Sequence, residues 1–545
     1  MKRFLLSTVY CLLSRRLKPA ATTAYCLLLT AYCLLPSDLW ASDPQTPYEL
    51  YRLGDEHLTR WEIEEAEEAS RTLVGLYGDS PEALYLASKV KFYLGDYNGA
   101  IKLLEGRPKD YPEGREFLVF LTRIYGTARD FAEYPTPHFL LRYTPGKDEV
   151  LLDYAQEALE KAYLEIGKDL DFSPKDKVVV EIYPTLESFS AASTLTRKEI
   201  ETSGAVAICH FNRLMVLSPR LLLRGYPWMD TLAHEYVHYV ISHKTRNLTP
   251  IWFHEGLAKF EESRWKSAGG RDLTPLQRHL LAQALERDSF ITFEEMHPSI
   301  AKLKSREDAA LAFAEVLSSI RYIVKRGGYP LLNEILQGIK GGKGVEEAVA
   351  DGLATSFDDF QREWHSYLHG LGLSKIPGLQ VMATKIKEPG KKEDSPMEIE
   401  AEETRRFTTL GDTLSEENRP DAALLEYEKA YQHSGLGSPQ VLNKLANSYL
   451  FNGRLEEAEG LLNETINSYP DYVSTYVTLG ELHKRKGEPQ RAIENYLEAS
   501  HINPFNPVVH QRLSTLYKEV GQEEEATASI NRLAILLKRE RTTAP

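Results

Sequence analysis

The sequence predicts an α+β domain flanked on both sides by all-α segments built from repeated pairs of helices. Two observations support this fold class. Strand-like and helix-like apolar patterns alternate within residues 131–374, and small residues recur every 34 positions on both sides of that region. A period of 34 residues is typical of stacked helix pairs. We therefore expect the following order: a leader 1–41, helical repeats 42–130, a central domain 131–374, a flexible charged linker 375–403 and a second repeat array 404–540.

The composition is that of a soluble globular protein, with 42% hydrophobic and 26% charged residues. A chain of 545 residues is too long for one hydrophobic core, which agrees with several domains. Its formal net charge of −14 argues against nucleic acid as a partner. Three of the four cysteines lie in the leader, so Cys209 stands alone and no internal disulfide is expected in a mature chain.

The leader resembles an export signal. Five basic residues lie within positions 2–18, an apolar run follows at 25–35, and Ala41 offers a small-residue cleavage position. We therefore expect an exported protein, periplasmic or extracellular in a bacterial envelope. The basic region is long and the apolar core is short, so an uncleaved anchor or a mis-assigned start stays open. The membrane would be a partner only if the leader is uncleaved.

The N-terminal segment contains two pairs of small residues at a helical-repeat spacing. Gly54 and Ala66 are twelve residues apart, as are Ser88 and Ala100, and Ala66 precedes Ala100 by 34 residues. Small side chains at these positions allow two antiparallel helices to approach closely. We predict two helix pairs here, extended by a further helix near residues 114–125.

The C-terminal third shows the same period more clearly, and we predict four stacked helix pairs within residues 404–537. Three columns of small residues recur at a spacing of 34: Gly453, Gly487 and Gly521; Ala458, Ala492 and Ala526; Ala446, Gly480 and Ser514. These columns resemble the tetratricopeptide repeat family. The resemblance implies a concave surface that binds a protein partner or docks on the chain itself, with no catalytic chemistry of its own.

The central region mixes strands and helices before it becomes mainly helical. The prolines in Tyr134-Pro-Thr-Pro137 end the helical pattern. The expected elements are a strand 138–143, a helix 147–170, a strand 178–183, a short helix 187–193, a strand 205–209, a turn 211–212 and a strand 213–217. This order predicts an α+β lobe joined to a helical lobe, with the functional site in the cleft between them.

The candidate site lies in residues 230–262. His234-Glu235-Tyr236-Val237-His238 falls in a stretch without Gly or Pro, so a helix is expected. Residues four apart share one face of a helix, so both imidazoles can bind the same zinc ion. Glu235 lies next to a ligand but is rotated away from it, which suits a carboxylate that acts as a general base on water.

Two neighbouring residues, His254 and Glu255, compete for the third ligand position. Two histidines and one glutamate would leave the fourth position of zinc open, as a catalytic zinc requires. A closed structural site would need a fourth protein ligand, for which Cys209 is the available cysteine. A structural interpretation without metal also exists, in which the histidines of the motif are hydrogen-bonded core residues and the glutamates are solvated helix charges.

Two sequence words carry a family resemblance. Leu-Ala-His-Glu-Tyr-Val-His at 232–238 and Pro-Ile-Trp-Phe-His-Glu-Gly-Leu-Ala at 250–258 resemble the peptidase-MA-like gluzincins, which are HExxH zinc metallopeptidases with a glutamate as third ligand. The resemblance covers about residues 137–372 and implies a zincin-like metallopeptidase domain. It also implies that the strand near 213–217 pairs with an extended peptide at the cleft edge.

The resemblance further implies the roles of individual residues. Zn2+ would be held by His234, His238 and Glu255, and Glu235 would be the general base. Related sequences often have Ala-Tyr where this chain has Ala312-Phe313, so the tyrosine that would stabilise the oxyanion is missing from that place. Other side chains that could replace it are Tyr322, Tyr239, His210 and His243.

Glu262 follows Glu255 by seven residues and so returns to the same helical face, where it could orient an imidazole. Its sequence context favours a solvated surface glutamate instead.

Two functions from different classes follow. The first is an exported zinc metallopeptidase that hydrolyses a peptide or protein substrate, with repeats that recruit substrates or protein partners. The alternative is an envelope scaffold whose gluzincin domain is inactive or only binds metal. The intact HExxH motif and Glu255 favour the enzyme, whereas Phe313 and the extent of the repeats favour the scaffold.

Overall fold

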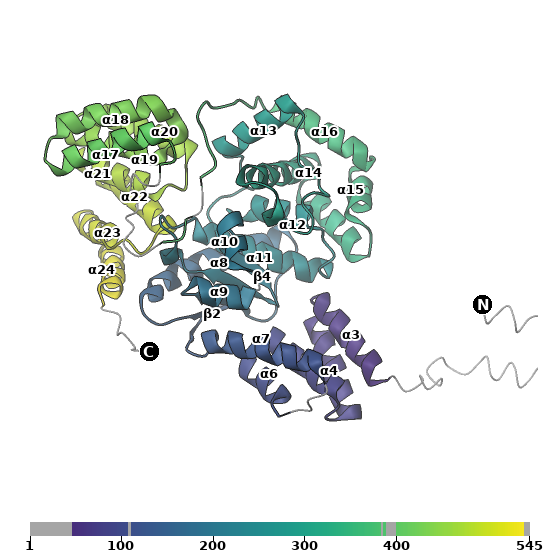
Figure 1. Ribbon diagram of the computed structural model, residues 1–545. Helices are drawn as coiled ribbons and strands as arrows, with labels where there is room; N and C mark the ends of the chain where they lie inside the picture. Colours follow the sequence, from purple (N-terminus) through teal and green to yellow (C-terminus); the bar gives the residue numbers. More distant parts are fainter. Residues whose placement is uncertain (1–45, 107–110, 194, 383–384, 388–398, 539–545) are drawn as a thin grey trace, which may run out of the picture.

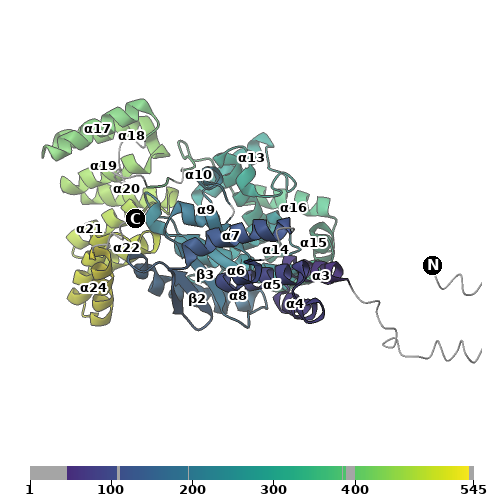
Figure 2. The same cartoon turned by 60° about the horizontal axis from the view of Figure 1, so that its bottom comes forward.

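The computed structural model describes residues 46–106, 111–193, 195–382, 385–387 and 399–538. It confirms the predicted fold class, because an α+β domain lies between two sets of paired helices (Figure 1). The first set packs against one side of this domain and the second runs along another side, as a second view shows (Figure 2). The predicted leader 1–41 lies outside the described residues.

The N-terminal segment contains the predicted helix pairs and the helix that follows them. A Cβ atom placed on Gly54 would lie 2.5 Å from Leu86 Cδ2, and Ala66 and Ala100 are fully buried. The small residues therefore mark close helix contacts, as expected. The helices are α3 (Pro47–Thr59), α4 (Ile63–Tyr77), α5 (Pro81–Tyr93), α6 (Tyr97–Leu104) and α7 (Pro112–Ala128).

The described strands form one sheet in the order β1-β2-β3-β5-β4. They are β1 (Ala132–Pro135), β2 (Phe139–Tyr143), β3 (Val178–Tyr183), β4 (Ala207–His210) and β5 (Arg213–Leu217). The three central strands are parallel, and β1 and β4 pair antiparallel at the two edges. β1 was not predicted from the sequence. This strand is short and half-exposed and it ends at Pro135, so it has no strong apolar alternation.

The expectation that residues 213–217 pair with a peptide at the cleft edge is wrong. β5 is hydrogen-bonded to β3 on one side and to β4 on the other, and all of its residues are buried. The edge strand next to β5 is β4, whose residues are half-buried and which packs against the helix that carries the HExxH motif.

Helices cover the sheet and continue into a helical lobe. The sheet lobe contains η2 (Lys147–Leu151), α8 (Leu152–Asp169), α9 (Leu186–Ser193) and α10 (Arg197–Ser203). The helical lobe contains η3 (Pro219–Leu221), α11 (Trp228–Thr245), α12 (Ile251–Glu261), α13 (Pro275–Arg287), η4 (Ile300–Lys302), α14 (Arg306–Lys340), α15 (Val345–Leu353) and α16 (Phe357–Gly370). α10 was not predicted from the sequence, although it begins with a capping box between Thr196 and Glu199.

The segment 375–403, predicted to be a flexible linker, makes ordered contacts in its described parts. The N–H of Leu223 donates to the carbonyl oxygen of Lys385 at 2.9 Å. Leu379 is buried against Tyr469 of the second array. These contacts therefore fix the second array to the central domain. The composition of the segment does not predict them, because they depend on a few apolar residues whose partners are distant in the sequence.

The C-terminal array contains the four predicted helix pairs within the described residues. They are α17 (Glu402–Glu416), α18 (Pro420–Ser434), α19 (Pro439–Phe451), α20 (Leu455–Ser468), α21 (Val473–Arg485), α22 (Pro489–Ile502), α23 (Pro507–Glu519) and α24 (Glu523–Leu537), with η6 (Gly435–Gly437) after the first pair. A Cβ atom on Gly480 would lie 2.7 Å from the Tyr496 ring. Gly453, Gly487 and Gly521 have φ of +75°, +74° and +80°, so this column provides the turns within the helix pairs.

Both arrays pack against the surroundings of α11. The Trp61 ring lies 5.7 Å from the ring of Tyr239 and 5.3 Å from that of His243, near the C-terminal end of α11. Near its N-terminal end, the N–H of Tyr226 donates to the carbonyl oxygen of Ile502 at 3.3 Å. The helix that carries the motif is therefore held between the two arrays.

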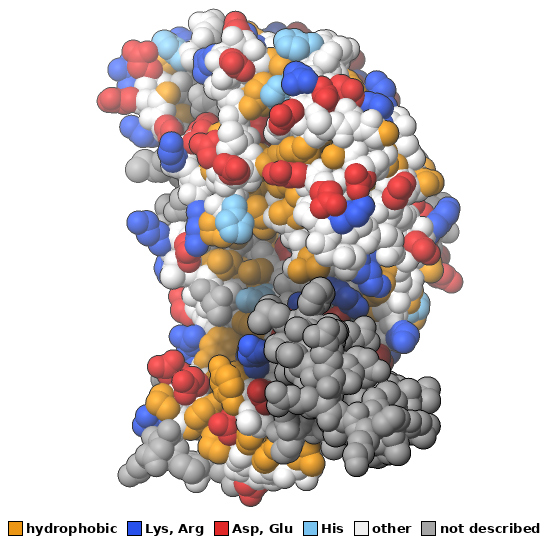
Figure 3. All heavy atoms as spheres, turned by 90° about the vertical axis from the view of Figure 1, so that its right-hand side faces the viewer, with side chains coloured by type: hydrophobic (Ala, Val, Ile, Leu, Met, Phe, Trp, Pro, Cys, Tyr) orange, Lys and Arg blue, Asp and Glu red, His pale blue; other side chains and the backbone are white. Residues whose placement is uncertain are grey.

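The face shown in Figure 3 carries acidic and basic side chains interspersed with apolar ones. Within the described residues, no helix is long and apolar enough to span a membrane.

Candidate metal centre

The two histidines of the motif lie one turn apart in the middle of α11 and point to the same side. Their Nε2 atoms are 3.1 Å apart, and both side chains are largely buried. The helix is buried along most of its length, with β4 and β5 on one side and α12 on another. Its position between these elements gives both imidazoles fixed directions.

Glu255 on α12 brings the third donor to the same point. Its Oε2 atom lies 3.3 Å from His234 Nε2 and 3.5 Å from His238 Nε2. Ligand atoms at about 2.0–2.1 Å from zinc in tetrahedral directions are about 3.3–3.4 Å apart. The three donors therefore have the spacing and the chemistry that fit Zn2+. Among the described residues, they form the group of three side chains that can hold one metal ion.

His254, the rival for the third ligand position, lies on the other side of His238. Its Nδ1 atom contacts Nδ1 of His238, and its Nε2 atom lies 3.4 Å from Ser242 Oγ. Burial lowers the pKa of His254 well below its usual value, so this imidazole is neutral. The geometry therefore brings Glu255, and not His254, together with the Nε2 atoms of the motif.

Glu262 is a buried partner of the metal site, whereas its sequence context favoured a solvated glutamate. Its Oε2 atom lies 3.1 Å from His234 Nδ1 and 2.9 Å from Lys259 Nζ, and Oε1 forms an ion pair with Arg271. Burial raises the pKa of Glu262, but the charges of Lys259 and Arg271 outweigh this effect, and the pKa falls far below its usual range. An anionic Glu262 can hold the proton of His234 on Nδ1 and leave Nε2 free for a metal.

Glu235 lies beside the donors without joining them. It is 5% exposed, and its Oε2 atom has no hydrogen-bond partner among the described residues. Burial raises the pKa of Glu235, while nearby His238 and His234 and the backbone N–H of Cys209 act in the opposite direction. Such a carboxylate suits proton transfer near neutral pH. The thiol of Cys209 is not part of the three-donor group, so the structure does not support it as a fourth ligand.

Most side chains that could replace the missing tyrosine have other contacts. Tyr322 Oη donates to Glu363 at 2.6 Å, and His243 Nε2 lies 2.9 Å from Asn212 Oδ1. His210 stacks on its neighbour Phe211, and burial lowers its pKa to about 4. The ring of Tyr239 packs against Trp61, as described above.

Sequence reasoning missed two residues that support the site. Lys259 lies one turn after Glu255, with Nζ 5.3 Å from the Phe313 ring centroid, and Arg271 comes from the segment before α13. Both pair with Glu262. Their charges alone carry no signal, because surface Lys and Arg residues are common; only the fold brings them to a buried carboxylate.

The fold and the site together define an α+β domain that carries a candidate metal centre and has paired helices on both sides. Residues 155–370 match the model of the Peptidase MA superfamily, and residues 408–472 and 443–507 match the tetratricopeptide repeat model. The chain therefore contains a Peptidase MA superfamily domain followed by tetratricopeptide repeats, as its sequence motifs predict.

Comparison with individual proteins finds similarity over short parts of the chain. A stretch of 93 residues is 33% identical to protein O-mannosyl-transferase TMTC3 of Homo sapiens and covers 16% of this chain and 10% of that protein. The chain thus spans about a tenth of that relative's length. Among solved structures, MamA is 21% identical over 24% of this chain and 76% of its own, with a TM-score of 0.23. A thermophilic TPR protein of Thermus thermophilus is 25% identical over 25% of this chain and 74% of its own, with a TM-score of 0.23.

Proposed function

We propose that this protein is an exported zinc-dependent metallopeptidase whose repeats recruit protein substrates or partners. One observation carries the proposal: the donor atoms of His234, His238 and Glu255 lie 3.1–3.5 Å from one another beside the buried carboxylate of Glu235. Three protein donors leave one tetrahedral position open, and an adjacent general base gives that position a catalytic use.

Each residue has a defined task in the proposed hydrolysis. When bound, zinc would polarise the scissile carbonyl and lower the pKa of a water molecule towards about 7. Glu235 accepts a proton from the attacking water and delivers it to the nitrogen of the leaving amine. Glu262 keeps His234 in the tautomer that binds through Nε2.

The edge strand β4 supports a peptide as the substrate. Its outer edge pairs with no other described strand, so an extended peptide can add to the sheet there. The backbone N–H of Cys209, within β4, is close enough to Glu235 to lower the pKa of its carboxyl. A peptide that pairs with β4 would therefore lie next to the proposed base.

The tetratricopeptide repeats support a protein as the substrate or partner. Stacked helix pairs present extended surfaces suited to protein binding. In this chain the second array is fixed beside α11, so a protein bound to it would be close to the metal centre.

Zinc content and cleavage of a mixed peptide library, measured for the wild type and Glu235→Gln, test the proposal. We expect about one zinc ion per chain in both proteins and turnover by the wild type only, because Glu235 contacts water and not the metal. Equal turnover by both proteins would rule out Glu235 as the base.

A scaffold that only binds metal is the second candidate. Phe313 favours it, since a phenyl ring cannot donate a hydrogen bond to a developing oxyanion. Zinc in the wild type without cleavage of any peptide in the library would support this function.

Export rests on the leader 1–41, with its basic residues and apolar run. N-terminal sequencing of the protein from its native host tests it. A mature chain that begins near Ser42 would establish cleavage, whereas a chain that retains the leader in the membrane fraction would establish an anchor.

A further inference from the structure

A cavity of about 390 Å³ lies where the central domain, the segment 375–403 and the second array meet. One side is formed by residues 222–227, by Lys259 of α12, by Glu262 directly after that helix and by Phe313 of α14. The other side is formed by Met382 and by the α20–α21 loop, residues 468–472.

Two wall residues place this cavity beside the metal centre. Glu262 contacts His234, and Lys259 follows the proposed ligand Glu255 by one helical turn. The carboxylate that contacts His234 is therefore part of the cavity wall.

The repeat array contributes a rigid part of the wall. Tyr469 is 6% exposed, its Oη atom donates to the carbonyl oxygen of Leu436 at 2.8 Å, and the same atom accepts the N–H of Gln380 at 3.4 Å. These bonds fix the ring at the cavity. The position of the loop 468–472 therefore depends on the repeats and on the segment that precedes them.

The wall is mainly apolar, and its charges near the metal centre pair within the protein. Lys259 and Arg271 both form ion pairs with Glu262. A charged side chain entering here would have to compete with these pairs, whereas an apolar side chain would bury its surface against rings and methyl groups. The apolar part of the lining includes Leu222, Tyr226, Leu276, Phe313, Met382 and Tyr469.

We propose that this cavity binds a large apolar side chain of the peptide next to the scissile bond, and that the loop 468–472 of the second array forms its outer wall. The inference rests on the proposed peptidase function and adds a specificity role for the repeats. The array is then part of the substrate cleft as well as a recruiting surface.

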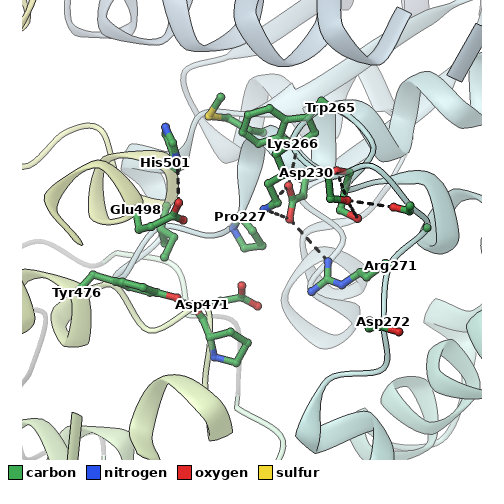
Figure 4. Close-up of a pocket in the computed structure, with 17 residues that line it drawn as sticks. Pro227, Asp230, Trp265, Lys266, Arg271, Asp272, Asp471, Tyr476, Glu498 and His501 are labelled. Atoms are coloured by element: carbon green, nitrogen blue, oxygen red, sulfur yellow. Dashed lines mark hydrogen bonds and ion pairs between the residues drawn. The ribbon is translucent and has the colours of Figure 1, made fainter. Parts of the chain in front are cut away.

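The cleft continues along the junction between the domain and the array. A neighbouring cavity of about 470 Å³ shares Pro227, Arg271, Pro470 and Asp471 with the first. Figure 4 shows Asp471 of the array and Arg271 of the central domain facing each other across it. An extended peptide therefore has room for further residues beyond the apolar pocket.

Peptide binding to Glu235→Gln tests the inference without hydrolysis. The probes are two fluorescently labelled decapeptide pools that differ only in a central Phe or Gly. Asp471→Trp and Met382→Trp fill the cavity from the array and from the preceding segment. Asp421→Trp is the matched control, because Asp421 is an exposed acid of the same array that lines none of the three cavities in this region.

We expect Glu235→Gln to bind the Phe pool at least about 10-fold more tightly than the Gly pool. The two filling substitutions should reduce this ratio to near one, with zinc content unchanged, and the control should keep it. An unchanged ratio in both filled variants would overturn the inference, as would no preference in Glu235→Gln itself. If the binding ratios are as expected but the wild type does not cleave the Phe pool, the proposed peptidase function is wrong while the inference about the cavity stands.

Discussion

The Nδ1 atom of His234 lies 3.1 Å from Oε2 of Glu262, a buried carboxylate that also pairs with Lys259 and Arg271. This contact fixes the orientation of one proposed ligand and increases its basicity. Glu262→Gln keeps the size of the side chain but removes its charge. We expect zinc affinity to fall by about 10–100-fold, measured by competition with a chelator of known affinity.

Glu261→Gln provides the control for this experiment. Glu261 is the preceding residue and is equally buried, but burial raises its pKa to about 8, so it is mostly neutral at pH 7. Its neutral isostere should therefore leave zinc affinity unchanged. Equal zinc affinity in Glu262→Gln and the wild type would show that the contact with His234 has no effect on metal binding.

The third ligand can be assigned by two neighbouring substitutions. Glu255→Ala removes the oxygen that lies 3.3 Å and 3.5 Å from the two Nε2 atoms, whereas His254→Ala removes a ring on the Nδ1 side of His238. We expect Glu255→Ala to lose more affinity than Glu262→Gln, since a ligand contributes more than its hydrogen-bond partner. His254→Ala should still bind one zinc ion per chain. The reverse order in zinc titrations would move the third ligand to His254.

Features with a local sequence period could be predicted from the sequence. The columns of small residues gave the helix pairs, and the spacing of His234 and His238 gave two donors on one face of a helix. Each depends on residues close together in the chain or on a repeated unit, so an isolated sequence is sufficient.

Features that depend on distant contacts could not be predicted. The burial of Glu262 depends on Arg271, which reaches it from outside α12, and the order within the segment 375–403 depends on Tyr469 of the second array. The edge position of β4 depends on the order of strands, which the strand patterns do not specify. In each case the neighbouring residues in the sequence carry no signal, and contacts with another element of the fold determine the role of the residue.

The pH dependence of stability should reveal the buried carboxyl of Glu315. This side chain is fully buried in α14, and burial raises its pKa to about 9, even though it accepts the N–H of Ile291 at 3.1 Å. The folded state therefore keeps a proton that the unfolded state releases above a pKa of about 4.5. Stability contributed by this group is present at low pH and decreases as the pH rises from about 4.5 to 9.

Glu315→Gln removes this titration while it keeps an oxygen that can accept from Ile291. We expect little difference from the wild type at pH 5, and at pH 8 a free energy of unfolding that is higher in the variant by roughly a few kcal/mol. Urea unfolding followed by tryptophan fluorescence at both pH values measures the effect. A constant difference at pH 5 and pH 8 would mean that Glu315 titrates alike in the folded and unfolded states.

Gly256, which follows the proposed ligand Glu255, should tolerate no larger side chain. A Cβ atom there would lie 2.6 Å from the carbonyl oxygen of Val316 and 2.8 Å from Ile320 Cγ1, so α12 packs directly on the backbone of α14. Gly256→Ala must push these helices apart. We expect a loss of about 1–3 kcal/mol of stability and weaker zinc binding, because Glu255 moves with α12.

Gly126→Ala is the control, because Gly126 is at an exposed position of α7 with open space around it. This substitution should stabilise the protein by about 0.5–1 kcal/mol and leave zinc affinity unchanged. If Gly256→Ala binds zinc like the wild type, the close contact of α12 with α14 does not position Glu255.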